Sequence, residues 1–272
     1  MELRVNKVCA SHPQVKAVRD VDLAVRDGQV VAIVGPNGCG KSTLLRTIAR
    51  LHKPDSGTVT IDAENVWSMS AKRAAHRIAL LPQSPTAPEA ITVADLVAHG
   101  RHPHQGLFRQ WSRADAIAAD TAMHDTSIVP LAGRRMETLS GGQRQRAWLA
   151  MSLAQETPIV LLDEPTSALD LGHTVEMLTL VRDIADSGRA IVMVVHDLVS
   201  AARYSDVVVA MRDGEVIASG PAASVVTSDL VRRLYDIDAD VLSAPGDAAP
   251  VVVPRAQSLG RDSGADNGSP SE

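Results

Sequence analysis

The sequence predicts an α/β fold with a parallel sheet at its core and a helical subdomain inserted into it. Continuous apolar runs, typical of strands buried on both faces of a sheet, occur at residues 30–34, 159–162 and 191–195. Each run is followed by polar residues and then by apolar residues at helical spacing, and this alternation favours parallel strands. Between residues 82 and 142 the alternation stops, and alanine-rich helical patterns and proline-rich loops predict the inserted subdomain.

Local signals place the other elements. Residues 21–26 alternate apolar and polar side chains, which predicts a half-buried strand that ends at the Asp27-Gly28 turn. A helix is expected from Lys41 to about Leu51, and Ser112 and Asp115 form a capping box that starts a helix of the inserted subdomain. Further strands are expected at residues 57–61, 78–81, 206–211 and 215–219, the last two joined by the hairpin signal Asp213-Gly214.

Composition excludes several classes of protein. The chain has 272 residues, 45% of them hydrophobic, so it can bury one large core. Three Trp, two Tyr and one Phe are too few for a base-stacking platform, and a net charge of −5 does not recruit phosphate polymers, so we expect no nucleic-acid partner. The longest apolar run, Ala190–Val195, is too short to cross a bilayer, and two cysteines suit a reducing cytosol.

The C-terminal part of the chain differs from the rest in composition. From residue 244 it turns to Gly, Ser, Ala, Asp and Pro, which predicts a main domain at residues 1–243 and an extension at residues 244–272. Within the extension we expect packing only from Val251–Val253, and disorder in about the last dozen residues.

A glycine-rich loop joins the strand at residues 30–34 to the next helix. Its residues Gly35-Pro36-Asn37-Gly38-Cys39-Gly40-Lys41-Ser42 fit the phosphate-loop pattern G-x-x-x-x-G-K-[ST]. Glycines let the backbone N–H groups surround phosphate oxygens, and the helix N-terminus adds its positive dipole. Lys41 is expected to reach the β- and γ-phosphates and the Ser42 hydroxyl to bind Mg²⁺, with Thr43 next to them in the same nucleotide site.

Cys39 lies within this loop, at the N-terminus of the predicted helix. A helix N-terminus lowers the pKa of a thiol, which predicts alkylation that bound nucleotide slows. The alternative is a small filling side chain that points away from the nucleotide.

Polar side chains follow three of the predicted strands. Asp163 and Glu164 end a buried strand, and ligands gather at the carboxyl ends of parallel strands. Asp163 is therefore expected to hold Mg²⁺, and Glu164 to orient or deprotonate the attacking water; the alternative is an acidic pair that caps the next helix. His196 follows residues 191–195, so it either contacts the γ-phosphate or is a structural histidine. Gln83 occupies the same kind of position after residues 78–81.

The segment Leu139-Ser140-Gly141-Gly142-Gln143 is the signature of ATP-binding-cassette proteins, and Ser140 lies 23 residues before Asp163. With the phosphate loop, Gln83, Asp163-Glu164, the Ser167–Asp170 segment and His196, the chain resembles a complete cassette from residue 3 to about residue 255. The resemblance implies a phosphate-loop NTPase core of the ABC ATPase type with an antiparallel N-terminal β subdomain and a helical subdomain at about residues 84–142.

The resemblance also implies an assembly. Cassettes of this family form homodimers in which each ATP lies between the phosphate loop of one chain and the signature of the other. Ser140, Gly141, Gly142 and Gln143 would thus bind the ATP of the partner chain, and the segment up to Asp170 would connect the two sites. Gln83 would follow Mg²⁺ and the water. In this family adenine commonly stacks on an aromatic residue near the N-terminus. In this chain no Tyr, Phe or Trp precedes Trp67, and His12 occupies the expected place. His12 either stacks on the base or is an exposed loop histidine.

Among cassettes, the chain is similar to the ATPase subunits of ferric-siderophore importers, the ferric-enterobactin type above all. The segments that carry this likeness are residues 81–83, 91–97, 100–108, 144–148 and 151–156, His173 after Asp170, and residues 196–198 and 202–204. The likeness implies transmembrane permease subunits, an extracytoplasmic siderophore-binding protein and a place at the cytoplasmic face of the membrane. Alternatives are a haem or cobalamin importer, an exporter subunit, and a soluble cassette acting on ribosomes or DNA.

Overall fold

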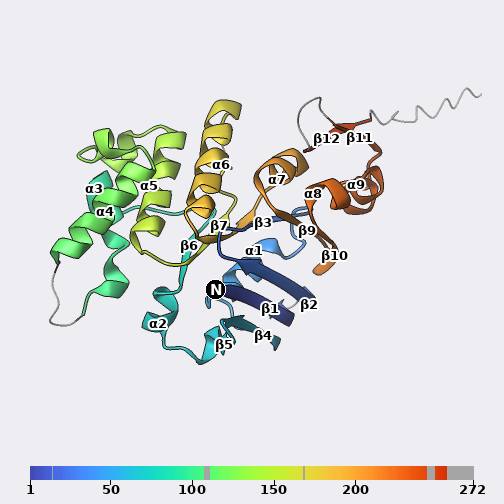
Figure 1. Cartoon of the computed structure of the whole chain (residues 1–272), viewed down its shortest axis with the longest axis horizontal. Coiled ribbons are helices and arrows are strands. Elements are labelled where there is room, and N and C mark those ends of the chain that lie inside the picture. The colour runs from blue at the N-terminus through green and yellow to red at the C-terminus, as the bar shows by residue number, and fades with distance from the viewer. Residues whose placement is uncertain (14, 107–110, 168, 244–248, 256–272) are drawn as a thin grey trace, which may run out of the picture.

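The computed structural model describes residues 1–13, 15–106, 111–167, 169–243 and 249–255. Its central sheet has the strand order β10-β9-β3-β8-β7-β6. All neighbouring strands from β9 to β6 pair in parallel, and β10 pairs antiparallel with β9. The predicted α/β fold with a parallel core is confirmed (Figure 1). The strands are β3 (Val30–Val34), β6 (Ile78–Leu81), β7 (Ile159–Asp163), β8 (Ala190–Val194), β9 (Val207–Arg212) and β10 (Glu215–Gly220).

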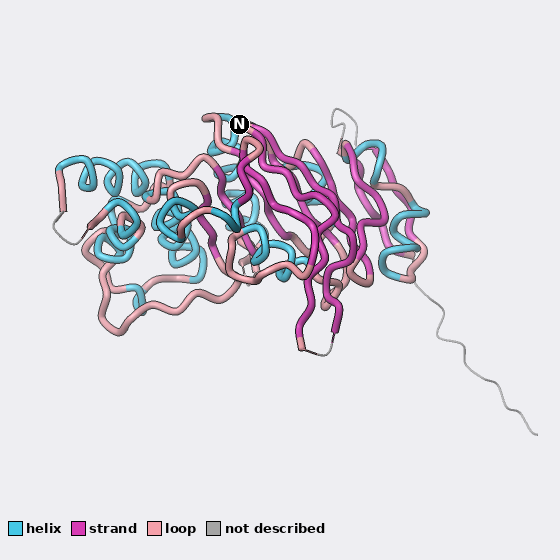
Figure 2. Tube along the Cα trace, turned by 90° about the horizontal axis from the view of Figure 1, so that it is seen from below, coloured by secondary structure: helices cyan, strands magenta, loops and turns pink. Residues whose placement is uncertain are grey.

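A second, antiparallel sheet contains the N-terminus and has the order β2-β1-β4-β5. Its strands lie beside those of the central sheet in Figure 2. They are β1 (Glu2–His12), β2 (Val15–Arg26), β4 (Ser56–Ile61) and β5 (Glu64–Asn65). The sheet is the antiparallel β subdomain that the resemblance implied.

Two apolar cores cover the two faces of the central sheet. Val31 and Ile33 of β3 pack into one core together with the antiparallel sheet and with helix α1 (Lys41–Ile48). Val30, Ala32 and Val34 pack into the other core, among the helices. Because successive side chains of a strand point to opposite faces, this division explains why the whole run at residues 30–34 is apolar.

Helices gather at both ends of the central sheet (Figure 1). Helices α3, α4 and α5 contact one another at one end, and helices α7, α8 and α9 lie towards the other. The capping box at Ser112 and Asp115 starts α4 as predicted. The longer helices are α3 (Val93–His99), α4 (Arg113–Asp125), α5 (Gly141–Ala154), α6 (Leu171–Asp186), α7 (Leu198–Tyr204) and α9 (Ser228–Tyr235); α2 (Ala71–Ala75) and α8 (Ala222–Val225) are single turns, and 3₁₀ turns form at Val66–Ser68, His102–His104, Val129–Leu131 and Met136–Thr138.

Two segments differ from the predicted boundaries. Helix α1 ends at Ile48 instead of Leu51, because Arg50 adopts a left-handed backbone with a φ of 62°. In the predicted extension, strand β12 (Pro250–Pro254) pairs with β11 (Ala239–Ser243), and Val252 packs against the core. The disorder expected in about the last dozen residues falls outside the described part of the chain, which ends at residue 255.

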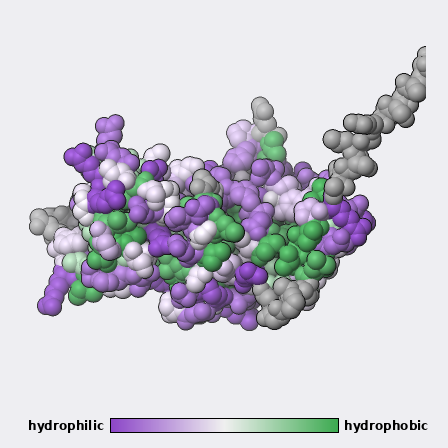
Figure 3. Space-filling view, turned by 90° about the horizontal axis from the view of Figure 1, so that it is seen from above, coloured by the Kyte–Doolittle hydropathy of each residue, from purple (hydrophilic) through white to green (hydrophobic). Residues whose placement is uncertain are grey.

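The surface of the described residues combines apolar and polar side chains. Apolar side chains form separate patches between polar ones on the face shown in Figure 3. Within the described ranges, every helix is too short or too polar to cross a bilayer.

Candidate nucleotide site

Two glycines of the phosphate loop, Gly35 and Gly40, lie directly against other strands, whereas Gly38 between them faces open space. A Cβ on Gly35 would come within 2.1 Å of the carbonyl oxygen of Met211 in β9, and a Cβ on Gly40 within 2.0 Å of that of Ala17 in β2. Gly40, the N-cap residue of α1, also has a φ of 104°, a left-handed conformation that glycine adopts readily. The loop is therefore fixed between the two sheets, with the N-terminus of α1 at its end.

Lys41 and Ser42 begin helix α1 and point their polar groups into the loop region. The Lys41 side chain is buried, and its Nζ donates hydrogen bonds to the carbonyl oxygens of Gly35 (2.7 Å) and Pro36 (2.9 Å). The ammonium group therefore lies inside the loop, where phosphate oxygens can replace these carbonyl oxygens as its hydrogen-bond acceptors. The Ser42 Oγ donates to Oδ1 of Asp163 at 3.0 Å, which joins the loop to the end of β7.

Asp163 has the environment of a metal ligand. Its carboxylate is 2% exposed, and burial raises its pKa above the ordinary value although the Ser42 hydroxyl bond acts in the opposite direction. A hydroxyl and a buried carboxylate are hard oxygen donors of the kind that Mg²⁺ prefers, and a divalent cation would compensate the buried charge. The donor set therefore fits the predicted Mg²⁺.

Glu164 is held at the centre of the site by two neighbours. Its Oε2 lies 2.6 Å from Nε2 of His196 and also accepts a hydrogen bond from the side-chain amide of Gln83. These partners follow β8 and β6, the strands on either side of β7, so the order of the strands brings all three side chains to one edge of the sheet. Glu164 has a left-handed backbone with a φ of 54°, an uncommon conformation that is found at functional sites.

A cavity of about 430 Å³ connects these groups. It extends from His12 on β1 along the phosphate loop to the carboxylate of Glu164, and the N-terminus of α1 opens into it. Nine of the nineteen predicted site residues line this one space, and Asp163 and His196 reach it only through their contacts with Ser42 and Glu164. Its lining consists of His12, Val15, Ala17, Asn37, Gly38, Gly40, Lys41, Ser42, Thr43, Gln83 and Glu164.

His12 lies at the outer end of this cavity. Its Nε2 is 3.1 Å from the Thr43 hydroxyl, and its ring centroid is 4.9 Å from that of His52, whose Nε2 donates to the Ser11 carbonyl. The ring is exposed on the side of the cavity, where a planar base could stack. His52 is a neighbour that the sequence did not single out, because its contact depends on how the β1–β2 hairpin packs against the end of α1.

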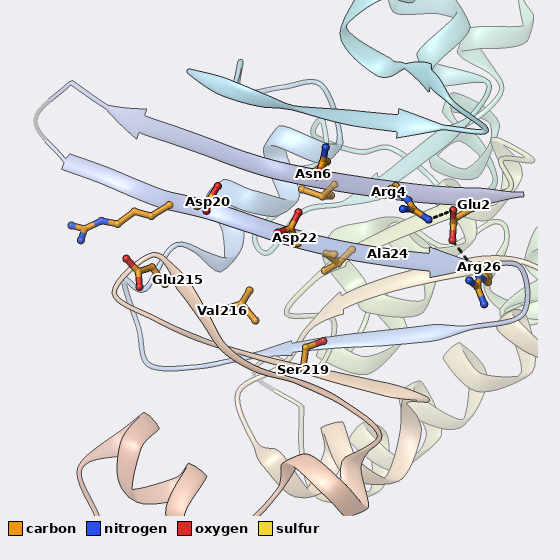
Figure 4. Close-up of a pocket in the computed structure, with 13 residues that line it drawn as sticks. Glu2, Arg4, Asn6, Asp20, Asp22, Ala24, Arg26, Glu215, Val216 and Ser219 are labelled. Carbon is orange, nitrogen blue, oxygen red and sulfur yellow. Dashed lines mark hydrogen bonds and ion pairs between the residues drawn. The ribbon is translucent and has the colours of Figure 1, made fainter.

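A larger recess, of about 760 Å³, lies elsewhere and does not suit a nucleotide. It lies between β2 and β10 (Figure 4), and the carboxylates of Asp20, Asp22 and Glu215 line it. Glu2 in the same recess accepts hydrogen bonds from Arg4 and Arg26, so these two guanidinium groups are already paired. With Arg19 the lining has three arginines against four carboxylates, a net negative charge that would repel phosphate, and no phosphate-loop residue is among its described lining residues.

The signature residues lie apart from the cavity. Ser140 is the N-cap of α5: its Oγ accepts from the Gln143 N–H and its own N–H donates to Oε1 of Gln143. Gly141 and Gly142 form the first turn of this helix. Asp170 is the N-cap of α6. Of the described residues that line the cavity, none belongs to the signature or is Asp170, as expected if these groups serve a second copy of the chain.

The prediction of a low pKa for Cys39 is wrong. The thiol is 5% exposed, and burial raises its pKa even though Lys41 lies nearby and lowers it. The side chain fills space behind the loop and does not line the cavity. Cys39 does lie next to the N-terminus of α1, but desolvation has a larger effect on the pKa of its thiol.

The fold and this cavity define a nucleoside triphosphatase of the phosphate-loop class, with an inserted helical subdomain that bears a second helix N-terminus. A family model described as ABC transporter matches residues 18–167. The chain is 44% identical over 253 residues to the ferric enterobactin transport ATP-binding protein FepC of Escherichia coli, a match that covers 93% of each chain. The chain therefore belongs to the ABC transporter family, among its ATPase subunits.

Other relatives and solved structures agree with this assignment. The probable siderophore transport system ATP-binding protein YusV of Bacillus subtilis is 43% identical, over 87% of this chain and 86% of its own. The cobalamin import ATP-binding protein BtuD of Halobacterium salinarum is 44% identical over 86% of this chain and 59% of its own. Among structures, one described as an inward-facing metal-chelate type ABC transporter superposes with a TM-score of 0.82 at 27% identity, over 93% of this chain and 97% of its own. A dimeric bacterial ABC transporter cassette superposes with a TM-score of 0.72 at 27% identity, over 80% of this chain and 98% of its own.

Proposed function

We propose that this chain is the ATP-hydrolysing subunit of an importer that takes up iron–siderophore complexes, and that it acts at the cytoplasmic face of the membrane. The observation that carries the proposal is the cavity in which the phosphate loop faces Glu164, whose carboxylate contacts both Gln83 and His196. The substrate class rests on the relatives FepC and YusV, whose names refer to ferric enterobactin and siderophore transport. Cobalamin is the second candidate, supported by the BtuD relative.

In the proposed reaction, ATP lies along the cavity with its base at His12 and its phosphates in the loop. Lys41 and the N–H groups at the start of α1 bind the β- and γ-phosphates. Ser42, Asp163 and the amide oxygen of Gln83 would hold Mg²⁺, which neutralises phosphate charge when it is bound. Glu164 orients the attacking water and accepts its proton, and His196 donates a hydrogen bond to the γ-phosphate.

The proposed assembly is a homodimer on a transmembrane permease, which in turn receives its cargo from an extracytoplasmic siderophore-binding protein. A homodimer would bring the signature at Ser140–Gln143 to the cavity of the partner, and the net charge of −5 supports the absence of nucleic acid.

A groove of about 310 Å³ suits a permease segment: Leu51, 70% exposed, and Leu80 of β6 line it, together with α2 and Gln155. Since Gln83 follows β6, a segment bound there would act on the residue that holds Glu164.

Uptake in a deletion strain tests the proposal. We expect wild-type protein to restore uptake of labelled iron–siderophore, and Lys41→Ala to fail because phosphate binding loses a charge-assisted contact. In purified form Lys41→Ala should lose ATPase activity by about 100-fold or more.

Labelled cobalamin and haem, supplied to the same strains, distinguish the alternatives. Restoration of cobalamin or haem uptake in place of siderophore uptake would contradict the proposed substrate. Near-normal ATPase activity of Lys41→Ala would contradict the proposed site itself.

A further inference from the structure

His173, in the first turn of α6, lies directly against the signature helix. Asp170, the N-cap residue, accepts the backbone N–H of His173 at 2.9 Å and lies 2.8 Å from its Nδ1 with both carboxylate oxygens. Because a carboxylate accepts, Nδ1 carries the hydrogen and donates it. The capping residue therefore fixes the orientation of the imidazole as well as the start of the helix.

The other face of this ring covers Gly142 of the signature. A Cβ on Gly142 would lie 2.5 Å from Cδ2 and 3.0 Å from Cγ of His173, so the ring occupies the place of a side chain there. Gly142 has no positive φ, in contrast to Gly40, and backbone conformation does not demand a glycine at this position. Within this chain, a side chain at position 142 is excluded by the His173 ring and not by the backbone conformation.

A second contact joins the same two helices one turn further on. Arg146 of α5 forms an ion pair with Glu176 of α6. The Arg146 side chain is 24% exposed and the Glu176 side chain 56% exposed, so the pair adds little stability, but it is a second point of contact between α5 and α6. The first two turns of α5 are thereby attached to the first two turns of α6.

This attachment orients the helix whose signature would serve a second copy of the chain. Asp170 is six residues after Glu164, which lines the cavity, and the signature lies outside that cavity. We infer that His173 is a positioning residue: held by Asp170 and packed on Gly142, it sets the placement of Ser140, Gly141 and Gly142, which form the phosphate site offered to the other chain. This inference rests on the proposed ATPase function.

Two substitutions separate the two contacts of His173. His173→Asn keeps an N–H close to the position of Nδ1, and with it the bond to Asp170, but removes the ring from Gly142. His173→Phe keeps a ring against Gly142 but cannot donate to Asp170. The matched control is His124→Asn on α4, where an exposed histidine also faces a carboxylate, that of Asp120 at 3.7 Å.

The measurements are ATPase kinetics of the purified full-length chain and equilibrium binding of ATP under conditions without turnover. For His173→Asn we expect kcat to fall about tenfold and the Hill coefficient to approach one, while ATP binding to the chain's own cavity stays within about twofold. His173→Phe should keep kcat within about threefold of wild type, and His124→Asn should equal wild type.

The inference is overturned if His173→Asn keeps the kcat and Hill coefficient of wild type, or if its ATP binding weakens in step with kcat, since a general structural effect would explain the latter. Absence of ATPase activity in the wild-type chain is a different outcome, which contradicts the proposed function itself. A thermal melt checks the contact independently: Gly142→Ala should lower Tm in the wild-type background and much less in the His173→Ala background, because the added methyl group then finds space.

Discussion

The two cysteines differ in a way that their positions in the sequence do not reveal. Cys39 belongs to the phosphate loop, yet burial raises the pKa of its thiol. Cys9 on β1 is partly exposed, and hydrogen bonds from Ser56 and from the backbone N–H of Asp20 lower the pKa of its thiol. We expect iodoacetamide at pH 8 to modify Cys9 faster than Cys39, because Cys9 has more thiolate and better access. Peptide mapping by mass spectrometry measures both rates, with Cys9→Ser as the control; faster labelling of Cys39 would contradict the burial argument.

Other residues of the site were predictable because their type and spacing are sufficient. The phosphate loop, Asp163, Glu164 and His196 each follow a recognisable strand, so topology alone brings them to one edge. The roles of His52 and His173 were not predictable from spacing, because each depends on a ring contact between elements distant in the sequence. Such contacts depend on side-chain packing, for which a single sequence contains no direct signal.

At the scale of elements, a strand was missed where its backbone is irregular. Strand β1 was not predicted from its residues because its period of two is interrupted: Leu3 and Val5 face the core, but so do Val8 and Ala10 after a register shift. Lys7, with a φ of 47°, lies inside that shift. The bounds of the regular strands β3 and β8 were predicted to within one residue, because burial on both faces makes every residue of such a strand apolar.

The helical subdomain depends on a buried ion pair that makes a prediction at this scale. Arg101 and Asp115 have side chains 4% and 2% exposed that lie 3.0 Å apart, and Arg101 also donates to the carbonyl oxygen of Ala154 at the end of α5. Asp115→Ala would remove one of the two carboxylates that pair with the buried guanidinium and leave only Glu156, 2.6 Å from Nη1, so we expect a loss of about 1.5–3 kcal/mol in the free energy of unfolding at pH 7. Urea denaturation followed by circular dichroism measures this loss, with Asp120→Ala as the exposed control on the same helix.

The same pair gives a pH dependence with a defined sign. Hydrogen bonds from Ser112, with the Arg101 bond and charge, lower the pKa of Asp115 to about 2, below that of an unfolded chain. The stabilisation is therefore complete above about pH 4 and is lost as the pH falls towards 2. The difference in unfolding free energy between wild type and Asp115→Ala should shrink over this range; a difference that stays constant would show that the carboxylate charge is not its source.

At the scale of the whole molecule, one chain offers half of each proposed site. The cavity at the phosphate loop contains groups for binding and for proton transfer, while the N-terminus of α5 with its signature lies outside it.

Glu164→Gln keeps the size of the side chain but cannot accept the proton of water, so ATP should bind and not turn over. We therefore expect Glu164→Gln to form a stable dimer in the presence of ATP and Mg²⁺, measured by gel filtration with light scattering. Lys41→Ala combined with Glu164→Gln should stay monomeric, since the phosphates lose their ammonium contact. If Glu164→Gln alone remained a monomer at saturating ATP, the shared arrangement of the two sites would be wrong.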